Sequence, residues 1–332
     1  MPLKTPVWWY KRDAKGAPFY RFAALPLSGL WWLAGAYKRL TARPYRAMKP
    51  VISVGNVTLG GSGKTPLERE LLRRLTKRGF KPALLTRGYG GSLEGPVKVE
   101  PEHSASEVGD EAVMIAADYL VYIARDRSEG LRFLEAVEPD IIITDDTHQN
   151  VSIHKDTHIL VVDGDTSDDS WPFGDELMFP CGPMREPLSA GLARADIVVL
   201  WLPDEGAIAD PRLLRRLSSK PVYVARLVPR PRSAPSKVIA FAAIAKPWKF
   251  KNTLSGLGYS LLDFIDFPDH QALDDATLTR LWDKAVAKGV SLITTEKDWV
   301  KLSPQWREKI DYLPITARFD DQAGFMRALL KE

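Results

Sequence analysis

Cysteine is almost absent from this chain of 332 residues, which contains Cys181 and no other. A single cysteine excludes a disulfide framework within the chain and any zinc site built from several cysteines, and it favours a reducing compartment, so we expect a cytoplasmic protein. Histidine is scarce too, and His103, His154 and His158 stand at no spacing typical of metal ligands. We therefore expect no zinc centre.

The N-terminal region lacks an apolar run long enough to cross a bilayer. Residues 22–37 are sixteen residues without a charge, interrupted by Pro26 and Gly29, whereas a spanning helix needs about 20 apolar residues. This run also lies too far into the chain for a signal peptide, and no cleavage site of small residues follows it. Neither a transmembrane helix nor a cleaved leader is expected.

Outside the first fifty residues, the chain carries no net positive charge. Residues 1–50 hold ten Lys or Arg against one Asp, a net charge of +9, so the remaining chain carries −5 of the total of +4. The same segment holds ten of the 32 aromatic residues, and Trp, Tyr, Lys and Arg favour the headgroup region of a membrane. We expect an interfacial helix on a cytoplasmic membrane face; the alternative is a core helix with a solvated basic face. Nucleic-acid binding is disfavoured, because cationic arms that bind nucleic acid are polar throughout.

Strand and helix patterns alternate along most of the chain. With 45% hydrophobic and 27% charged residues, the composition is that of a globular protein, and the length predicts two domains. The alternation predicts an α/β fold with a doubly wound, mostly parallel sheet of P-loop NTPase type and a second, smaller α/β domain. Three prolines in residues 228–235 indicate a linker. We expect a membrane-associated segment at 1–48, a core domain at 49–227 and a smaller domain at 228–332 that closes over the cleft.

The most informative stretch is VISVGNVTLGGSGKT at residues 51–65, an apolar strand followed by a glycine-rich loop and a helix start. Triphosphate oxygens need several converging backbone N–H donors, and such a loop before a helix N-terminus supplies them. Lys64 would reach the β- and γ-phosphates, and the Thr65 hydroxyl would hold Mg²⁺. The general pattern has Gly where this chain has Thr58. The candidate nucleotide-binding residues are Thr58, Gly60, Gly61, Ser62, Gly63, Lys64 and Thr65.

A second informative stretch, DIIITDD at residues 140–146, is an apolar strand that ends in Asp145 and Asp146. A phosphate loop requires an acidic partner to hold Mg²⁺, and either aspartate could be the direct ligand. Basic residues follow two other predicted strands: Arg87 begins the loop RGYGG, and Arg125 and Arg127 follow residues 120–124. The carboxyl ends of parallel strands are where such sheets bind ligands.

Phosphoryl transfer also needs a group that accepts the proton of the attacking alcohol. The sequence offers Asp110, Glu111, His148 and His270, and spacing does not choose among them. The acids at 110 and 111 precede an apolar helix, where they could equally act as favourable capping charges.

These motifs, taken together and in order, resemble the tetraacyldisaccharide 4′-kinases of lipid A biosynthesis. The resemblance covers nearly the whole chain and rests on VISVGNVTLGGSGKTP, LLTRGYGG, VGDEA, ARDR, IIITDD with Gln149, CGPMREPL, FPDHQAL and TTEKDWVKL. That family carries Ser or Thr at the position of Thr58. The resemblance implies transfer of the γ-phosphate of ATP, with Mg²⁺, to the 4′-hydroxyl of a membrane-held disaccharide 1-phosphate lipid.

The resemblance also implies roles for individual residues. Asp110 resembles the catalytic base, and His270 resembles the residue that pairs with Asp110 from the second domain. Lys64, which would reach the phosphates, is counted as catalytic with them. Substrate contacts are implied for a further set: Arg87, Glu111, Arg125, Arg127, Gln149, Arg185 and Glu186. The alternative for Arg185 and Glu186 is that they pair with each other. A peripheral monomer on the cytoplasmic face of the inner membrane of a Gram-negative bacterium is implied as well.

Two departures from the family pattern stand out. Thr147 follows the aspartate pair where the family has Gly, and a β-branched residue is poorly suited to positive φ. Glu176 and Leu177 stand where the family tends to have Gly and a cation. A rival interpretation is a P-loop GTPase, acting as a switch or metallochaperone, because TTEKD at residues 294–298 superficially resembles the guanine-reading motif N-K-x-D.

Overall fold

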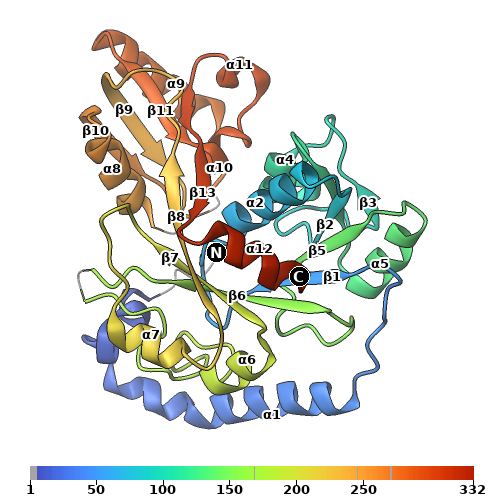
Figure 1. Cartoon of the computed structure of the whole chain (residues 1–332). Helices are drawn as coiled ribbons and strands as arrows, with labels where there is room; N and C mark the ends of the chain where they lie inside the picture. Colours follow the sequence, from blue (N-terminus) through green and yellow to red (C-terminus); the bar gives the residue numbers. More distant parts are fainter. Residues whose placement is uncertain (1–5, 168, 245, 270) are drawn as a thin grey trace.

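The computed structural model describes residues 6–167, 169–244, 246–269 and 271–332. Within these residues the strands form one sheet of nine and one of four. Figure 1 shows the smaller sheet and its helices beside one end of the larger sheet, with the helix α1 along the far side of the molecule. This architecture confirms the predicted α/β fold with a large, mostly parallel sheet and a smaller α/β unit.

The nine-stranded sheet has the order β13-β8-β7-β6-β1-β5-β2-β4-β3 and is parallel except at its two edges. Its strands are rich in Val, Ile and Leu and are largely buried on both faces, as expected of parallel strands covered by helices. In chain order they are β1 (Val51–Gly55), β2 (Pro82–Thr86), β3 (Val97–Lys98), β4 (Leu120–Ile123), β5 (Ile141–Asp145), β6 (Thr157–Asp163), β7 (Ile197–Leu202), β8 (Val222–Pro229) and β13 (Ile315–Phe319).

Alternate residues of these strands point to opposite faces, and a different set of helices covers each face. Ile52 and Ile143 pack with residues of α2 (Lys64–Lys77), α4 (Asp110–Ala116) and α12 (Gln322–Leu330) in one core cluster. Val51 and Ile142 pack on the other face with α5 (Arg127–Glu135). Further along that face, β6 and β7 pack against α6 (Leu188–Arg194) and α7 (Pro211–Leu217). The short helix α3 (Ala105–Val108) precedes α4.

The four-stranded sheet has the order β10-β9-β11-β12 and is parallel throughout. Its strands are β9 (Lys237–Ala242), β10 (Ser260–Asp266), β11 (Ser291–Thr295) and β12 (Asp311–Leu313). The helix α8 (Pro247–Gly256) packs on one face, and α9 (Asp275–Ala287) and α11 (Pro304–Arg307) on the other. The helix α10 (Glu296–Trp299) follows β11 directly.

The end of the chain leaves the smaller unit and returns to the larger one. The strand β13 pairs antiparallel with β8, and Phe325 and Leu329 of α12 are buried in the main core cluster. The predicted boundary at 228 assigned residues 315–332 to the smaller domain, and the structure differs there. The pattern of a strand and a following helix does not say which sheet the strand joins, because an edge position is decided by free backbone donors and acceptors elsewhere in the chain.

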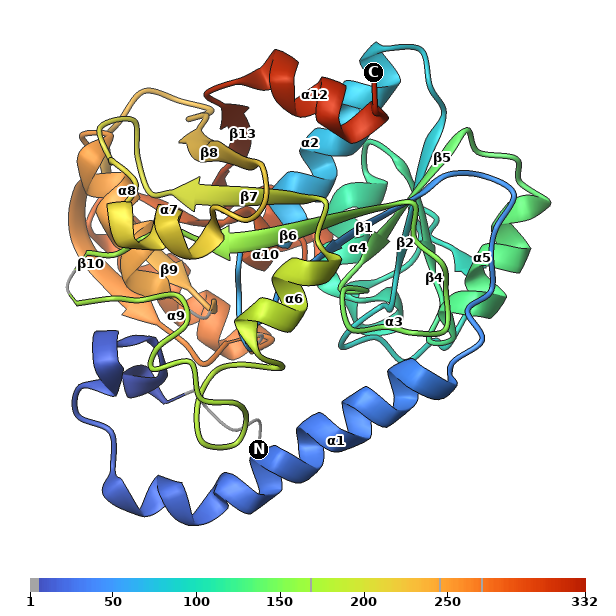
Figure 2. The same ribbon diagram turned by 60° about the horizontal axis from the view of Figure 1, so that its bottom comes forward.

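The N-terminal segment forms three short 3₁₀ turns, at Val7–Tyr10, Arg12–Ala14 and Phe19–Ala24, and then α1 (Leu25–Thr41). Figure 2 shows α1 lying alongside the body of the protein and joined to β1 by an extended segment. Many of its large apolar side chains are solvent-exposed: Leu25, Leu27, Leu30, Trp31, Trp32, Leu33, Tyr37 and Leu40. Among the described residues, no helix has the length and apolar character that crossing a bilayer would require.

Candidate active site

The phosphate loop lies between β1 and α2, at the carboxyl edge of the large sheet. Gly63, the residue before α2, has φ +82°, and its carbonyl accepts a hydrogen bond from the Trp201 indole N–H at 3.0 Å. A Cβ atom at this position would lie 2.6 Å from Trp201 Nε1. Both the left-handed backbone and the close indole therefore require glycine here. The Gly63 carbonyl is thus bound to Trp201, and the first N–H groups of α2, like those of any helix, have no partner within the helix.

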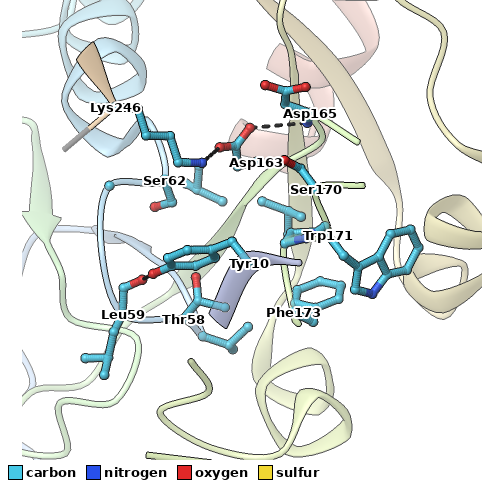
Figure 3. Close-up of a pocket in the computed structure, with 15 residues that line it drawn as sticks. Tyr10, Thr58, Leu59, Ser62, Asp163, Asp165, Ser170, Trp171, Phe173 and Lys246 are labelled. Atoms are coloured by element: carbon cyan, nitrogen blue, oxygen red, sulfur yellow. Dashed lines mark hydrogen bonds and ion pairs between the residues drawn. The ribbon is translucent and has the colours of Figure 1, made fainter. Parts of the chain in front are cut away.

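The N-terminal segment reaches this loop, which the sequence did not indicate. The Tyr10 hydroxyl donates to the Leu59 carbonyl, and a Cβ on Gly60 would lie 2.7 Å from that hydroxyl. Burial raises the pKa of Tyr10 to about 12. Figure 3 shows Tyr10 lying across the loop, with Thr58 and Ser62 nearby. The cavity that remains there is about 20 Å³, enough for a single water molecule.

The two aspartates after β5 have different surroundings. Lys64 Nζ lies 3.4 Å from Asp146 Oδ1, and Arg185 Nη1 lies 2.9 Å from Asp146 Oδ2. Burial alone would raise the pKa of Asp146, but these two cations outweigh it and hold that pKa below its ordinary value. Asp145 is more deeply buried, and its Oδ2 accepts from the Thr86 hydroxyl at 2.9 Å. The phosphate loop and the aspartate pair, which the sequence predicted to form one Mg²⁺ site, thus contact each other through Lys64 and Asp146.

Glu68 belongs to the same cluster and was missed from the sequence. It lies one helical turn after Lys64, so both side chains share a face of α2, and it is fully buried beside Asp145. Burial raises the pKa of Glu68 well above its ordinary value, and the neighbouring Asp145 carboxylate raises it further. A protonated Glu68 can donate to Asp145. No sequence signal marked it, because the helix pattern does not show which of its acids faces the core.

Thr147 is accommodated because the turn places its left-handed residue one position earlier. Asp146 has φ +51°, and aspartate tolerates this region better than a β-branched residue does. The Thr147 side chain is buried, and its hydroxyl lies 2.9 Å from Ser53 Oγ and 2.7 Å from Thr144 Oγ1. The expected difficulty at Thr147 does not arise.

The donors around the loop suit Mg²⁺ bound together with a nucleotide. Asp145 Oδ1 and Ser62 Oγ are buried and have no hydrogen-bond partner among the described residues. The described chain contains no group of three or more His, Cys, Asp or Glu arranged to hold a metal by itself. Mg²⁺ takes one or two carboxylates and completes its shell with water and phosphate oxygens. Thr65 and the aspartate pair would hold the ion.

Asp110 and Glu111 form the first turn of α4, where the helix dipole favours their charges. Asp110 is buried, and its Oδ1 accepts from the Glu111 backbone N–H at 2.9 Å. The loop RGYGG packs against this turn, since a Cβ on Gly109 would lie 2.6 Å from the Tyr89 carbonyl oxygen. Lys297 of α10 extends from the smaller unit to the same place, 3.0 Å from Glu111 Oε1 and 3.9 Å from Asp110 Oδ2.

The two histidine candidates differ in outcome. His270 lies outside the described residues, so its pairing with Asp110 stays a prediction. His148 is buried, and its Nε2 lies 3.1 Å from the Gly191 carbonyl oxygen. Burial and nearby cations, Arg194 first among them, lower the pKa of His148 to about 3. A neutral ring that donates to a backbone carbonyl is poorly placed to accept a substrate proton.

The candidate arginines are placed differently from one another. Arg87 is exposed at the carboxyl end of β2. Arg125 is exposed and pairs with Glu94 at 2.5 Å. Arg127 is buried, and its guanidinium donates to the carbonyls of Ala124 at 2.5 Å and Asp145 at 3.1 Å. Burial lowers the pKa of Arg127, and these carbonyl contacts place it behind the aspartate pair.

Arg185 and Glu186 do not pair with each other. Arg185 contacts Asp146, whereas Glu186 accepts from Arg194 Nη2 at 2.5 Å and from Gln149 Nε2 at 2.9 Å. Gln149 also donates to the Asn56 carbonyl at 2.7 Å, just before the phosphate loop. Buried Glu186 and partly buried Gln149 therefore form a hydrogen-bond network that ends on the Asn56 carbonyl, next to the phosphate loop.

Comparison with known proteins decides the family. A family model described as "Tetraacyldisaccharide-1-P 4'-kinase" matches residues 20–332. Two proteins named tetraacyldisaccharide 4'-kinase, from Phenylobacterium zucineum and a Caulobacter species, are 49% and 46% identical over 98% and 100% of this chain and over 98% and 99% of their own lengths. The chain belongs to the tetraacyldisaccharide 4′-kinase family. The resemblance noted from its motifs is confirmed.

A solved structure extends this comparison to three dimensions. The "apo" form of the family member LpxK from Aquifex aeolicus, crystallised in complex with ATP, matches with a TM-score of 0.74 at 25% identity, over 94% of this chain and 99% of that one. The match spans both sheets of the chain. The fold expected of a tetraacyldisaccharide 4′-kinase is therefore present along nearly its whole length.

The departure at Glu176 and Leu177 lies close to the phosphate loop, because the Leu177 carbonyl accepts from the Met184 N–H at 3.1 Å and Met184 forms a β-bridge with Thr58. Glu176 has φ +62° and pairs with Arg216. The Leu177 backbone N–H donates to Asp175 Oδ1 at 3.3 Å, and Asp175 Oδ2 pairs with Arg21 at 2.5 Å. In this tetraacyldisaccharide 4′-kinase family member, the segment connects the N-terminal region to the loop at 178–187.

The rival GTPase interpretation loses its main support at Asp298. A guanine-reading aspartate must present its carboxylate to the base, but Asp298 is buried and its Oδ2 accepts from the Ala243 N–H and the Thr295 hydroxyl, both at 2.8 Å. The residues TTEKD thus form the start of α10 and its cap. Membership of the kinase family replaces the GTPase interpretation.

Proposed function

We propose that this chain transfers the γ-phosphate of ATP to the 4′-hydroxyl of a tetraacyldisaccharide 1-phosphate lipid, a step of lipid A biosynthesis. The observation that carries the proposal is one arrangement in a chain of this family. The phosphate loop, the aspartate pair that contacts Lys64, and the acids of α4 all lie at the carboxyl edge of the large sheet.

The loop residues bind and orient the triphosphate in this proposal. Backbone N–H groups at the start of α2, together with Lys64, neutralise the β- and γ-phosphates. Thr65 and the aspartate pair hold Mg²⁺, which when bound neutralises charge on the phosphate oxygens. Arg185, now bound to Asp146, is close enough to the Lys64 ammonium to share this task.

Asp110 accepts the proton of the 4′-hydroxyl in the proposed reaction. As the proton moves to the carboxylate, the sugar oxygen bonds to the γ-phosphorus, the bond from that phosphorus to the bridging oxygen breaks, and ADP leaves. Burial of Asp110 at a helix N-terminus keeps its carboxylate fixed and sheltered from bulk water. We retain His270 as the partner of Asp110.

The acyl chains of the substrate require a membrane surface, and α1 provides an apolar face that fits one. Its exposed Trp31, Trp32 and leucines are followed by Lys38 and Arg39 in the last turn, a combination that suits an anionic interface. We infer peripheral attachment of a monomer to the cytoplasmic face of the inner membrane. Among the arginines, the exposed Arg87 is the best candidate to bind the 1-phosphate.

Radiolabel transfer tests the proposal. Purified full-length chain is incubated with γ-labelled ATP or GTP and tetraacyldisaccharide 1-phosphate in mixed micelles, beside the variants Lys64→Ala and Asp110→Ala. We expect labelled lipid from ATP with the wild type and a loss of at least 100-fold in either variant. Hydrolysis of GTP without any labelled lipid would instead favour the interpretation as a P-loop GTPase.

A further inference from the structure

The cation Lys297 lies at the boundary between the two units of the protein, and no role in the reaction has yet been given to it. It is the second residue of α10, which begins directly after β11 of the smaller sheet. Its ammonium lies 3.0 Å from Glu111 Oε1 and 3.9 Å from Asp110 Oδ2, both in the first turn of α4 on the larger sheet. It therefore joins the two units at the two acids of the first turn of α4.

A second acid approaches Lys297 from the smaller unit. Asp269, three residues after the end of β10, acts electrostatically on the Lys297 ammonium together with Glu111 and Asp110. Burial alone would lower the pKa of Lys297, but these carboxylates outweigh it and hold that pKa above its ordinary value. Lys297 is thus a permanent cation among acids from α4 and from the loop after β10.

The neighbouring contacts fix the backbone that carries this ammonium. Glu296 accepts from Arg69 of α2 at 2.7 Å, so α10 is also tied to the helix that follows the phosphate loop. Asp298 is bound to Thr295 and to the Ala243 N–H, which anchors the first turn of α10 on the smaller sheet. Lys297 therefore has its backbone fixed on the smaller unit and its ammonium bound to α4 of the larger one. Such a residue can couple the position of one unit to that of the other.

We propose that Lys297 is a positioning residue that holds the Asp110 carboxylate in place for proton abstraction when the smaller unit is seated against the phosphate loop. The proposal rests on the function proposed above. An ammonium 3.9 Å from a carboxylate oxygen favours the ionised carboxylate. The Lys297 ammonium lies closer to Glu111 than to Asp110. The ammonium therefore does not take the place of the substrate hydroxyl at the Asp110 carboxylate.

Replacement of Lys297 by Met removes the positive charge and keeps a side chain of similar length. We expect kcat to fall by at least 30-fold while the Kd for ATP stays within about twofold, because the phosphate loop is untouched. We also expect the acidic limb of the pH profile of kcat/KM to move up by about one pH unit or more, since a nearby cation no longer favours the carboxylate. The groups that face Lys297 and contribute to this profile are Asp110, Glu111 and Asp269.

Chemical rescue makes the test specific for the ammonium. Cys181 is 0% exposed and is the chain's sole cysteine, so the thiol of Lys297→Cys, at a position where the lysine side chain is 23% exposed, is the more reachable of the two. Aminoethylation of that thiol with bromoethylamine restores an ammonium at nearly the original distance, and we expect it to recover at least a third of the wild-type kcat. Lys284→Met is the matched control, since Lys284 pairs with Asp263 within the smaller unit; its kcat should equal that of the wild type.

The outcomes separate the two proposals. If the wild type transfers no phosphate, the proposed function fails; if it does and Lys297→Met retains kcat within twofold, only the role of Lys297 fails. Urea unfolding checks that each variant is folded. Should the Lys297 variants not fold, Glu111→Gln weakens the hold on the Lys297 ammonium instead, at a residue whose side chain is 37% exposed. We expect its kcat to drop threefold or more at unchanged ATP Kd. An undiminished kcat in this variant would overturn the proposal.

Discussion

Replacement of Gly63 by Ala probes the packing that shapes the phosphate loop. An alanine at φ +82° costs about 1–2 kcal/mol. The new Cβ would lie 2.6 Å from Trp201 Nε1 and 2.7 Å from Cδ1, about 1 Å inside ordinary contact. Trp201 must then move and give up its hydrogen bond to the Gly63 carbonyl, worth about 1 kcal/mol. We expect the free energy of unfolding to fall by about 3 kcal/mol in total.

The assay is urea unfolding of four proteins that form a cycle, namely the wild type, Gly63→Ala, Trp201→Leu and the double variant. If the indole is what Gly63 avoids, the double variant should lose about 1–2 kcal/mol less than the sum of the single losses. Gly61→Ala is the matched control, because no described atom outside its neighbours lies within 4 Å of a Cβ there. Additive losses, or an equal loss in Gly61→Ala, would refute the packing argument.

Three further predictions follow from other parts of the structure. Leu30→Glu combined with Leu33→Glu, at positions 62% and 56% exposed, should abolish pelleting with anionic liposomes and leave the free energy of unfolding unchanged; pelleting like that of the wild type would contradict the membrane face of α1. Tyr10→Phe removes the hydroxyl that donates to Leu59, so the free energy of unfolding measured in urea should fall by about 1 kcal/mol. An unchanged free energy of unfolding would contradict a stabilising role for this hydrogen bond. Burial and the nearby Lys155 lower the pKa of His158 to about 4; the unfolded chain therefore binds more protons between about pH 6.5 and pH 4, and stability falls as the pH drops through this window. His158→Gln should lose about 1–2 kcal/mol less than the wild type between pH 7 and pH 5, and equal losses in the two proteins would show that His158 does not contribute.

Much of the large sheet was predictable because its strands are strongly patterned. The strands β2 (Pro82–Thr86) and β11 (Ser291–Thr295) coincide with short β-branched or apolar runs between turn residues, a pattern that leaves little alternative to a strand. The phosphate loop and the aspartate pair were predictable for the same reason, with each motif placed at the end of a buried strand. Parallel strands then bring Lys64 and Asp146 to one edge.

The remaining features depend on contacts between distant segments. Tyr10 reaches Leu59 across 49 positions, and Lys297 reaches Glu111 across 186; neither pairing has a local signature. The edge strand β13 pairs with β8 through backbone hydrogen bonds, which do not depend on which amino acids are present. Glu68 is hidden for another reason, because an amphipathic helix pattern does not reveal that both acids of α2, Glu68 and Glu70, are buried.

The most direct measurement of the central claim is the single-turnover rate of phosphate transfer from ATP to tetraacyldisaccharide 1-phosphate, in the wild type and in Asp110→Asn, together with the Kd for ATP. Our account predicts a rate that falls by about 10²- to 10⁴-fold with ATP binding unchanged, because only proton abstraction is lost. A single-turnover rate in Asp110→Asn equal to that of the wild type would contradict it.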